Sequence, residues 1–139
     1  MKSVILKSAA SFLFIPLLVL SLLVLWRGHN LPGGGFIGGL LAASSFVLMT
    51  LAEGVNATRI KLRAEPVSLI GTGLLIAIFA ALLPLFAGDT FFTGLWLPSF
   101  ELPVLGKIHL GTPLIFDIGV YVTVIGFAMA VVFQLEELE

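Results

Sequence analysis

Four long stretches of this chain carry no charged side chain except one aspartate near the start of the last. They cover residues 8–26, 28–52, 66–88 and 108–135, where His109 and Asp117 interrupt the fourth. About 20 mostly apolar residues in a helix cross the ~30 Å hydrocarbon core of a bilayer. We therefore expect four transmembrane helices at about 8–26, 36–52, 66–88 and 113–135. The second starts after a Pro/Gly loop, and Pro113 suits a first helical turn.

Composition supports an all-α membrane protein that forms a single domain over residues 1–139. Hydrophobic residues make up 59% of the chain and charged residues 11%, against about 25% charged in soluble domains. The net charge of −1 gives no reason to expect nucleic-acid binding, and the absence of cysteine excludes disulfides and thiolate metal sites. No nucleophile–base pair, paired carboxylates or metal cluster stands out, so we expect no enzyme, cofactor or metal. The N-terminus resembles a signal peptide, but no small-residue cleavage site follows, and we expect a retained helix.

The basic residues predict the orientation of the chain. Two of them, Arg27 and Lys107, fall on one side of the four spans. Five fall on the other side, namely Lys2, Lys7, Arg59, Lys61 and Arg63. The positive-inside rule then places both termini in the cytoplasm. On the outer side, residues 100–110 are expected to form a short β-hairpin, although Pro98 and Pro103 each remove a backbone donor. Residues 53–65 are expected to be an ordinary inner loop.

A glycine-rich segment before the second span is the strongest local signal. It contains Gly28, His29, Asn30, Pro32, Gly33, Gly34, Gly35, Phe36, Gly38 and Gly39. One interpretation is a tight loop followed by a helix start. The other is a docking or ion-pathway element, in which His29 and Asn30 face a partner or water. Small residues also recur every four positions (Gly35, Gly39, Ala43 and Gly34, Gly38, Ala42), which predicts close helix packing against a partner in this chain or another.

Asp117 is the most informative single residue, because a carboxylate at the bilayer centre costs roughly 2.5–3.5 kcal/mol on insertion scales. Near a helix start at Pro113 the cost is smaller, and the helix dipole can hold the acid. The alternative is a proton- or cation-binding group. Tyr121 lies one turn later on the same face and can hydrogen-bond the acid. Topology also predicts that Asp117 meets His29 or Asn30 inside a four-helix bundle.

These residues resemble the B subunit (MrpB, also MnhB) of the multisubunit Mrp-type Na+/H+ antiporter. The family pattern Gly-His-Asn-x-Pro-Gly-Gly-Gly-Phe matches residues 28–36, and the segment from Phe116 to Tyr121 supports it. Length, the four-helix layout and the charged C-terminal tail agree as well.

The resemblance implies a small subunit in the prokaryotic cell (inner) membrane, needed for assembly and contributing to an ion or proton path. It also implies A, C, D, E, F and G type subunits as partners in the bilayer, with Na+ and H+ as the ions of the complex. The positions that it makes most important are His29, Pro32, Gly33, Gly34, Gly35, Phe36 and Asp117. Two alternatives stay open: the equivalent subunit of a membrane-bound hydrogenase-type complex, and a purely structural scaffold.

Overall fold

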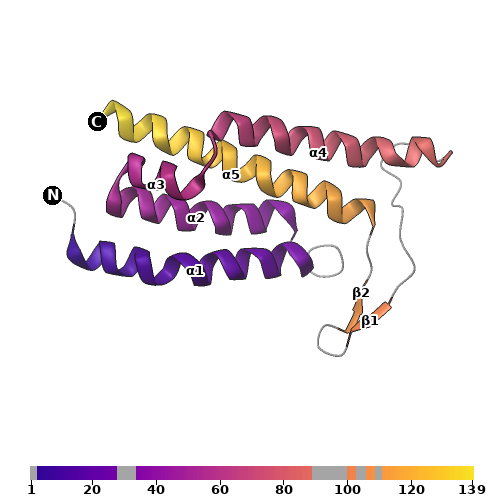
Figure 1. Cartoon of the computed structure of the whole chain (residues 1–139), viewed down its shortest axis with the longest axis horizontal. Helices are drawn as coiled ribbons and strands as arrows, with labels where there is room; N and C mark the ends of the chain where they lie inside the picture. The colour runs from indigo at the N-terminus through magenta and orange to yellow at the C-terminus, as the bar shows by residue number, and fades with distance from the viewer. Residues whose placement is uncertain (1–2, 28–33, 89–99, 103–105, 109–110) are drawn as a thin grey trace.

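A computed structural model describes residues 3–27, 34–88, 100–102, 106–108 and 111–139. Its helices are α1 (Val4–Arg27), α2 (Gly35–Glu53), α3 (Val55–Leu62), α4 (Pro66–Phe86) and α5 (Thr112–Leu138) (Figure 1). Two short strands, β1 (Phe100–Leu102) and β2 (Gly106–Ile108), pair antiparallel, with Phe100 opposite Ile108. The residues that would turn between them, 103–105, lie outside the described part of the chain.

Four segments of the described chain are helical, long and apolar enough to cross a membrane. They are Val4–Arg27, Gly35–Glu53, Val55–Phe86 and Thr112–Leu138. This is the number that the charge-free stretches predict. The third segment includes both α3 and α4, and α4 alone starts at the predicted Pro66.

The expectation that 53–65 is an ordinary loop is wrong, because its middle part is the helix α3. Gly54 has φ 98°, a value open to glycine, and it separates α2 from α3. Arg63 adopts the left-handed conformation that ends α3. Glu65 is extended, as expected before a proline, and Pro66 begins α4. Two breaks thus isolate a helix too short to span a membrane.

The helices lie side by side in the order α1, α2, α5, α4, as Figure 1 shows. Among the described elements α4 packs against α5 only, and it contacts neither α1 nor α2. The predicted four helices are therefore arranged as an open row, in which α4 touches only one of the other three long helices. A row leaves many apolar side chains on its faces, such as Phe12, Leu75 and Phe127, each more than 60% exposed. Such surfaces are tolerated in lipid or against other membrane proteins.

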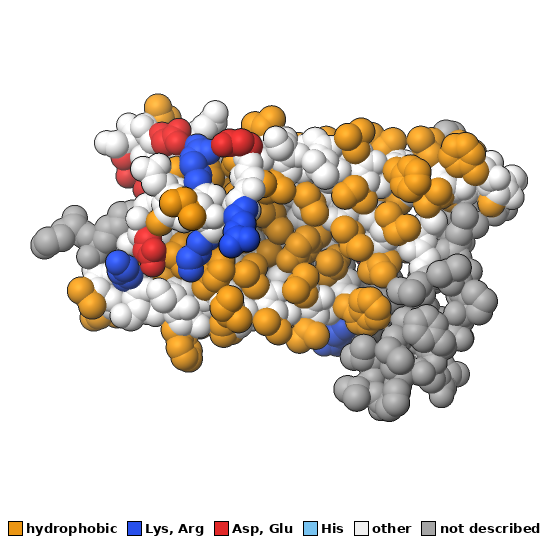
Figure 2. Space-filling view, in the orientation of Figure 1, with side chains coloured by type: hydrophobic (Ala, Val, Ile, Leu, Met, Phe, Trp, Pro, Cys, Tyr) orange, Lys and Arg blue, Asp and Glu red, His pale blue; other side chains and the backbone are white. Residues whose placement is uncertain are grey.

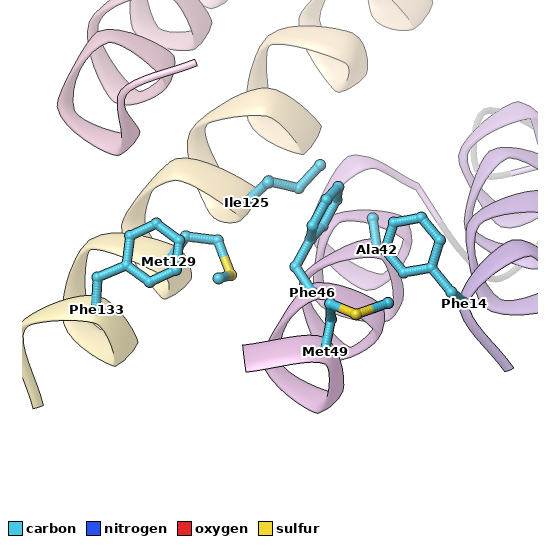
Figure 3. Packing of buried hydrophobic residues seen from close by; sticks show 7 residues of the cluster. All are labelled: Phe14, Ala42, Phe46, Met49, Ile125, Met129 and Phe133. Carbon is cyan, nitrogen blue, oxygen red and sulfur yellow. The ribbon is translucent and has the colours of Figure 1, made fainter. Parts of the chain in front are cut away.

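The buried hydrophobic cluster lies in the half of the row that α3 covers. Figure 3 shows its members: Phe14, Ala42, Phe46, Met49, Ile125, Met129 and Phe133. The rings of Phe14 and Phe46 meet edge to face with their centroids 5.2 Å apart, which joins α1 to α2. Val55 and Leu62 pack against the cluster from α3. This short helix therefore covers the buried cluster where α1, α2 and α5 meet.

Arg59 links α3 to the start of α4 and to the end of α5 through ion pairs. Its guanidinium lies 3.2 Å from the carboxylate of Glu65, just before α4, and 2.9 Å from that of Glu137, near the end of α5. The same group stacks 4.6 Å above the ring of Phe133. Exposed ion pairs contribute little singly, but here one cation joins three segments. Sequence reasoning missed this role, because the partners are 6 and 78 residues away.

Candidate functional site at the start of the second helix

The acid at position 117 packs directly against the glycines that open α2. A methyl group added at Gly34 would come within 3.7 Å of a carboxylate oxygen of Asp117. One added at Gly35 would overlap the backbone carbonyl oxygen of Asp117 and lie 2.9 Å from its carbonyl carbon. Gly34 has φ 110°, a conformation that other residues rarely adopt. The sequence Gly34-Gly35 is therefore required by both the backbone turn and the close approach of α5.

The first turn of α2 offers amide groups to a negative charge. Gly34 occupies the N-cap position but has no side chain to cap the helix. The first four N–H groups of a helix have no partner within it, and the helix end carries a partial positive charge. The half-buried carboxylate of Asp117 lies at this end. A negative charge is generally favoured at this end of a helix. The Asp117 side chain lies beside the start of α2 and near the start of its own helix.

Two faces of α2 contact two different helices through small residues. Gly35 and Gly39 lie against α5, where a methyl group at Gly39 would be 3.0 Å from the carbonyl oxygen of Tyr121. Gly38 lies against α1, where a methyl group would be 2.9 Å from the carbonyl oxygen of Ser21. The four-residue spacing of small residues thus corresponds to contacts within this chain, a point that the sequence left open. Phe36, in contrast, is 59% exposed.

Tyr121 makes its hydrogen bond to α1. Its phenolic oxygen lies 2.8 Å from the hydroxyl of Ser21, which itself donates to the carbonyl oxygen of Leu18 at 2.6 Å. Because the single proton of Ser21 is used in this way, Tyr121 is the donor in the first bond. Its proton is then not available to Asp117, contrary to the expected pairing. Sequence reasoning missed Ser21, which the structure shows to be fully buried. The available signal was a hydroxyl side chain within an otherwise apolar span.

We expect Tyr121→Phe to lower the unfolding free energy by about 0.6 kcal/mol, the average for hydrogen bonds between membrane helices. The ring would stay in place, and only the bond that links α5 to α1 would be lost. Unfolding of the purified chain by SDS titration measures the change. Ser21→Ala removes the same bond, so the double variant should be little worse than either single variant. Fully additive losses would show that the two hydroxyls do not act together.

The site lies at one edge of the apolar region. Gly34 N–H donates to the carbonyl oxygen of Val24 at 3.2 Å, so α2 begins level with the last turn of α1. Between this level and the last turn at the opposite end, the four long helices contain no charged residue; Lys7, Glu53, Glu136 and Glu137 lie in those end turns. The helix α4 continues further: Gly119, two residues after Asp117, contacts Ala77, and nine more residues of α4 follow Ala77, the last of them Phe86. Asp117 therefore lies level with the ends of α1 and α2, whereas α5, which begins at Thr112, and α4 both extend further on this side.

Described polar groups do not form a continuous track through the row. At the other end, Thr50 and Thr58 are fully buried, with their hydroxyls 3.1 Å apart. The hydrophobic cluster around Phe46 and Ile125 lies between this pair and the Tyr121–Ser21 bond. A proton relay needs successive polar groups or water. The described interior of this chain therefore does not connect the two ends by itself.

Five of the predicted site residues lie outside the described part of the chain: Gly28, His29, Asn30, Pro32 and Gly33. The predicted meeting of His29 or Asn30 with Asp117 stays a prediction. The described end of the segment, Gly34 and Gly35, does lie against Asp117.

Comparison with known proteins identifies the same family as the two motifs. The model of a domain related to the MnhB subunit of Na+/H+ antiporters matches residues 5–130. The B subunit of the Na(+)/H(+) antiporter of Bacillus subtilis is 38% identical over 135 residues, which is 97% of this chain and 94% of that protein. The B subunit of the Alkalihalophilus pseudofirmus antiporter is 38% identical over 121 residues, 87% and 83% of the two chains. The chain is a multi-pass membrane protein and belongs to the MnhB family of Na+/H+ antiporter subunits.

Proposed function

We propose that this chain is a small subunit of a multisubunit Na+/H+ antiporter in the prokaryotic cell membrane, needed to assemble the complex. Both termini lie in the cytoplasm, and the partners are subunits of the A, C, D, E, F and G types. Relatives over nearly the whole chain are named as the B subunit of a Na(+)/H(+) antiporter, which supports the parent complex. The excess of Lys and Arg around α3 and the N-terminus supports the orientation.

One observation carries the more specific part of the proposal: the contact of Asp117 with Gly34 and Gly35. This contact brings the glycine-rich segment and the segment around Asp117 together in one site at the edge of the apolar region. A carboxylate in this position holds the start of α2 and places a negative charge where a cation or proton enters from the outer side. Since the described interior is interrupted by the hydrophobic cluster, the ion path of the complex runs along the surface of this chain against its partners.

The open faces of the row support a non-autonomous subunit. One shallow groove lies between α4 and α5, and its lining includes Leu74, Ile78 and Phe116. Another lies between α2 and α5, and its lining includes Val47 and Ala128. The hydroxyls in these grooves are satisfied within their own helices, since Thr123 donates to Gly119 and Ser44 to Leu40. Both grooves therefore offer apolar surface for neighbouring helices in the complex.

Replacing the acid tests this role. In everted membrane vesicles, Asp117→Asn should lower Na+/H+ antiport at least about tenfold, equivalent to about 1.4 kcal/mol, while the complex still assembles. The amide keeps the shape and an acceptor for the α2 amides but removes the charge. Assembly is measured by co-purification of partner subunits through a tag on this chain. His29→Ala serves as a second variant at the same motif.

Other outcomes would contradict parts of the proposal. Unchanged antiport in Asp117→Asn would remove the charge from the mechanism and leave a scaffold. Loss of both assembly and antiport in Asp117→Asn would assign the acid to structure alone. Co-purification with a hydrogenase module in place of antiporter subunits would reassign the parent complex.

A further inference from the structure

A basic surface on α3 remains after Arg59 is assigned to its two carboxylates. Lys61 and Arg63 are exposed, and among the described residues neither makes an ion pair. Ile60, next to Lys61 on the same short helix, is 75% exposed. Figure 2 shows the blue basic groups of this region close to orange hydrophobic surface. Exposed cations around an exposed branched aliphatic residue are typical of helices that lie at a lipid interface.

The position of Arg63 agrees with the boundary of the hydrocarbon core. Three residues after it, Pro66 begins α4, whose 21 residues contain no charge. At about 1.5 Å per residue this helix is about 31 Å long, the thickness of the core. Arg63 therefore lies at the level of the lipid headgroups. Lys61 reaches the same region from the side of α1, with its ammonium group 4.6 Å above the ring of Phe14.

We propose that Lys61 and Arg63 form a binding site for the phosphate of an anionic phospholipid, with Ile60 inserted among its acyl chains. The acids nearby do not neutralise this pair. Glu65 and Glu137 are bound to Arg59. The other described charges of this side are Lys7, Glu53, Glu136 and Glu139, and none of these acids forms an ion pair with Lys61 or Arg63. The ring of Phe14 holds Lys61 by a cation–π contact, so part of the ordering of its side chain precedes lipid binding.

The experiment uses the full chain in nanodiscs that contain equal parts of phosphatidylglycerol and phosphatidylcholine. After the protein has been released from the nanodiscs, native mass spectrometry gives the number and type of lipids that remain bound to it. The wild-type chain should retain phosphatidylglycerol in preference to phosphatidylcholine. The double variant Lys61→Gln/Arg63→Gln should lose this preference, with roughly a fivefold drop in affinity per charge removed.

The matched control is Lys61→Arg/Arg63→Lys, which keeps both charges on the same backbone and should retain the preference. Equal retention of phosphatidylglycerol in the glutamine variant, or no preference in the wild type, would overturn the proposal. If the Lys61→Gln/Arg63→Gln variant does not fold, the wild-type chain provides the test. Its preference for phosphatidylglycerol should weaken when the salt concentration rises from about 0.1 to about 1 M. A preference that does not depend on salt would overturn the proposal. Neither result depends on the parent complex, so the proposed function is tested separately.

Discussion

Gly73→Ala should separate α4 from α5 and destabilise the chain by at least about 3 kcal/mol, the upper end of ordinary overpacking. The added methyl group would overlap the hydroxyl of Thr123 and lie 2.6 Å from the carbonyl oxygen of Gly119. Both obstacles belong to α5, and one is backbone that cannot turn away. Because α4 packs against no other described helix, its only other attachment is at its start, where Glu65 pairs with Arg59. Unfolding by SDS titration of the full chain measures the loss.

Gly71→Ala, two residues earlier on the same helix, is the matched control. Nothing lies within 4 Å of a methyl group added at Gly71. Alanine is the better helix former by about 0.8–1.0 kcal/mol, so this change should be neutral or stabilising. The pair separates the effect of helix contact from that of helix propensity. Equal stability of the two variants would mean that the close approach of α4 to α5 is not present.

Gly35→Ala should have a similarly large effect on α2, with a loss of about 3 kcal/mol or more through overpacking at the backbone of α5. The methyl group would overlap the carbonyl oxygen of Asp117 and lie 3.0 Å from Cβ of Val120. Moving α2 away also removes its first turn from the carboxylate of Asp117. We therefore expect lower stability, loss of partner subunits on purification, and loss of antiport together.

Ile37→Ala is the control for this change, because it lies two residues further on the same helix and is 47% exposed. It should cost far less than Gly35→Ala in the same SDS titration. A second check uses the acid itself: in an Asp117→Asn background, Gly35→Ala should still be severe, since the obstacle is backbone. If Asp117→Asn relieved the defect, the side chain and not the backbone of residue 117 would be the main contact.

The sequence predicts the spans well because the cost of burying charge in lipid limits where they can be. Each described helix of membrane length begins and ends within four residues of its predicted bounds. That the glycine-rich segment and Asp117 lie on the same side of the membrane follows from counting the spans between them. The sequence also predicted that this segment meets Asp117, but through His29 or Asn30; the contact of Asp117 with Gly34 and Gly35 was found only in the structure.

The order of the helices could not be predicted, because every span is apolar all round. In water, an apolar stripe shows which face of a helix is buried, but in lipid no such stripe is needed. The position of α5 between α2 and α4 required the structure, in which glycines make the close contacts, for example Gly35 with Asp117 and Gly73 with Gly119. The helix α3 was missed for another reason: its eight residues are polar and charged enough to look like a loop.

The place of α5 in the row affects how the chain is made. It is synthesised after α1, α2, α3 and α4, yet it is the element that connects α4 to the α1–α2 pair. Until its 27 residues enter the bilayer, α4 has no described neighbour to pack against and can drift in the lipid. A nascent chain halted before Thr112 would therefore be two independent pieces joined by a tether. The row of four helices can therefore form only after α5 has been made and inserted.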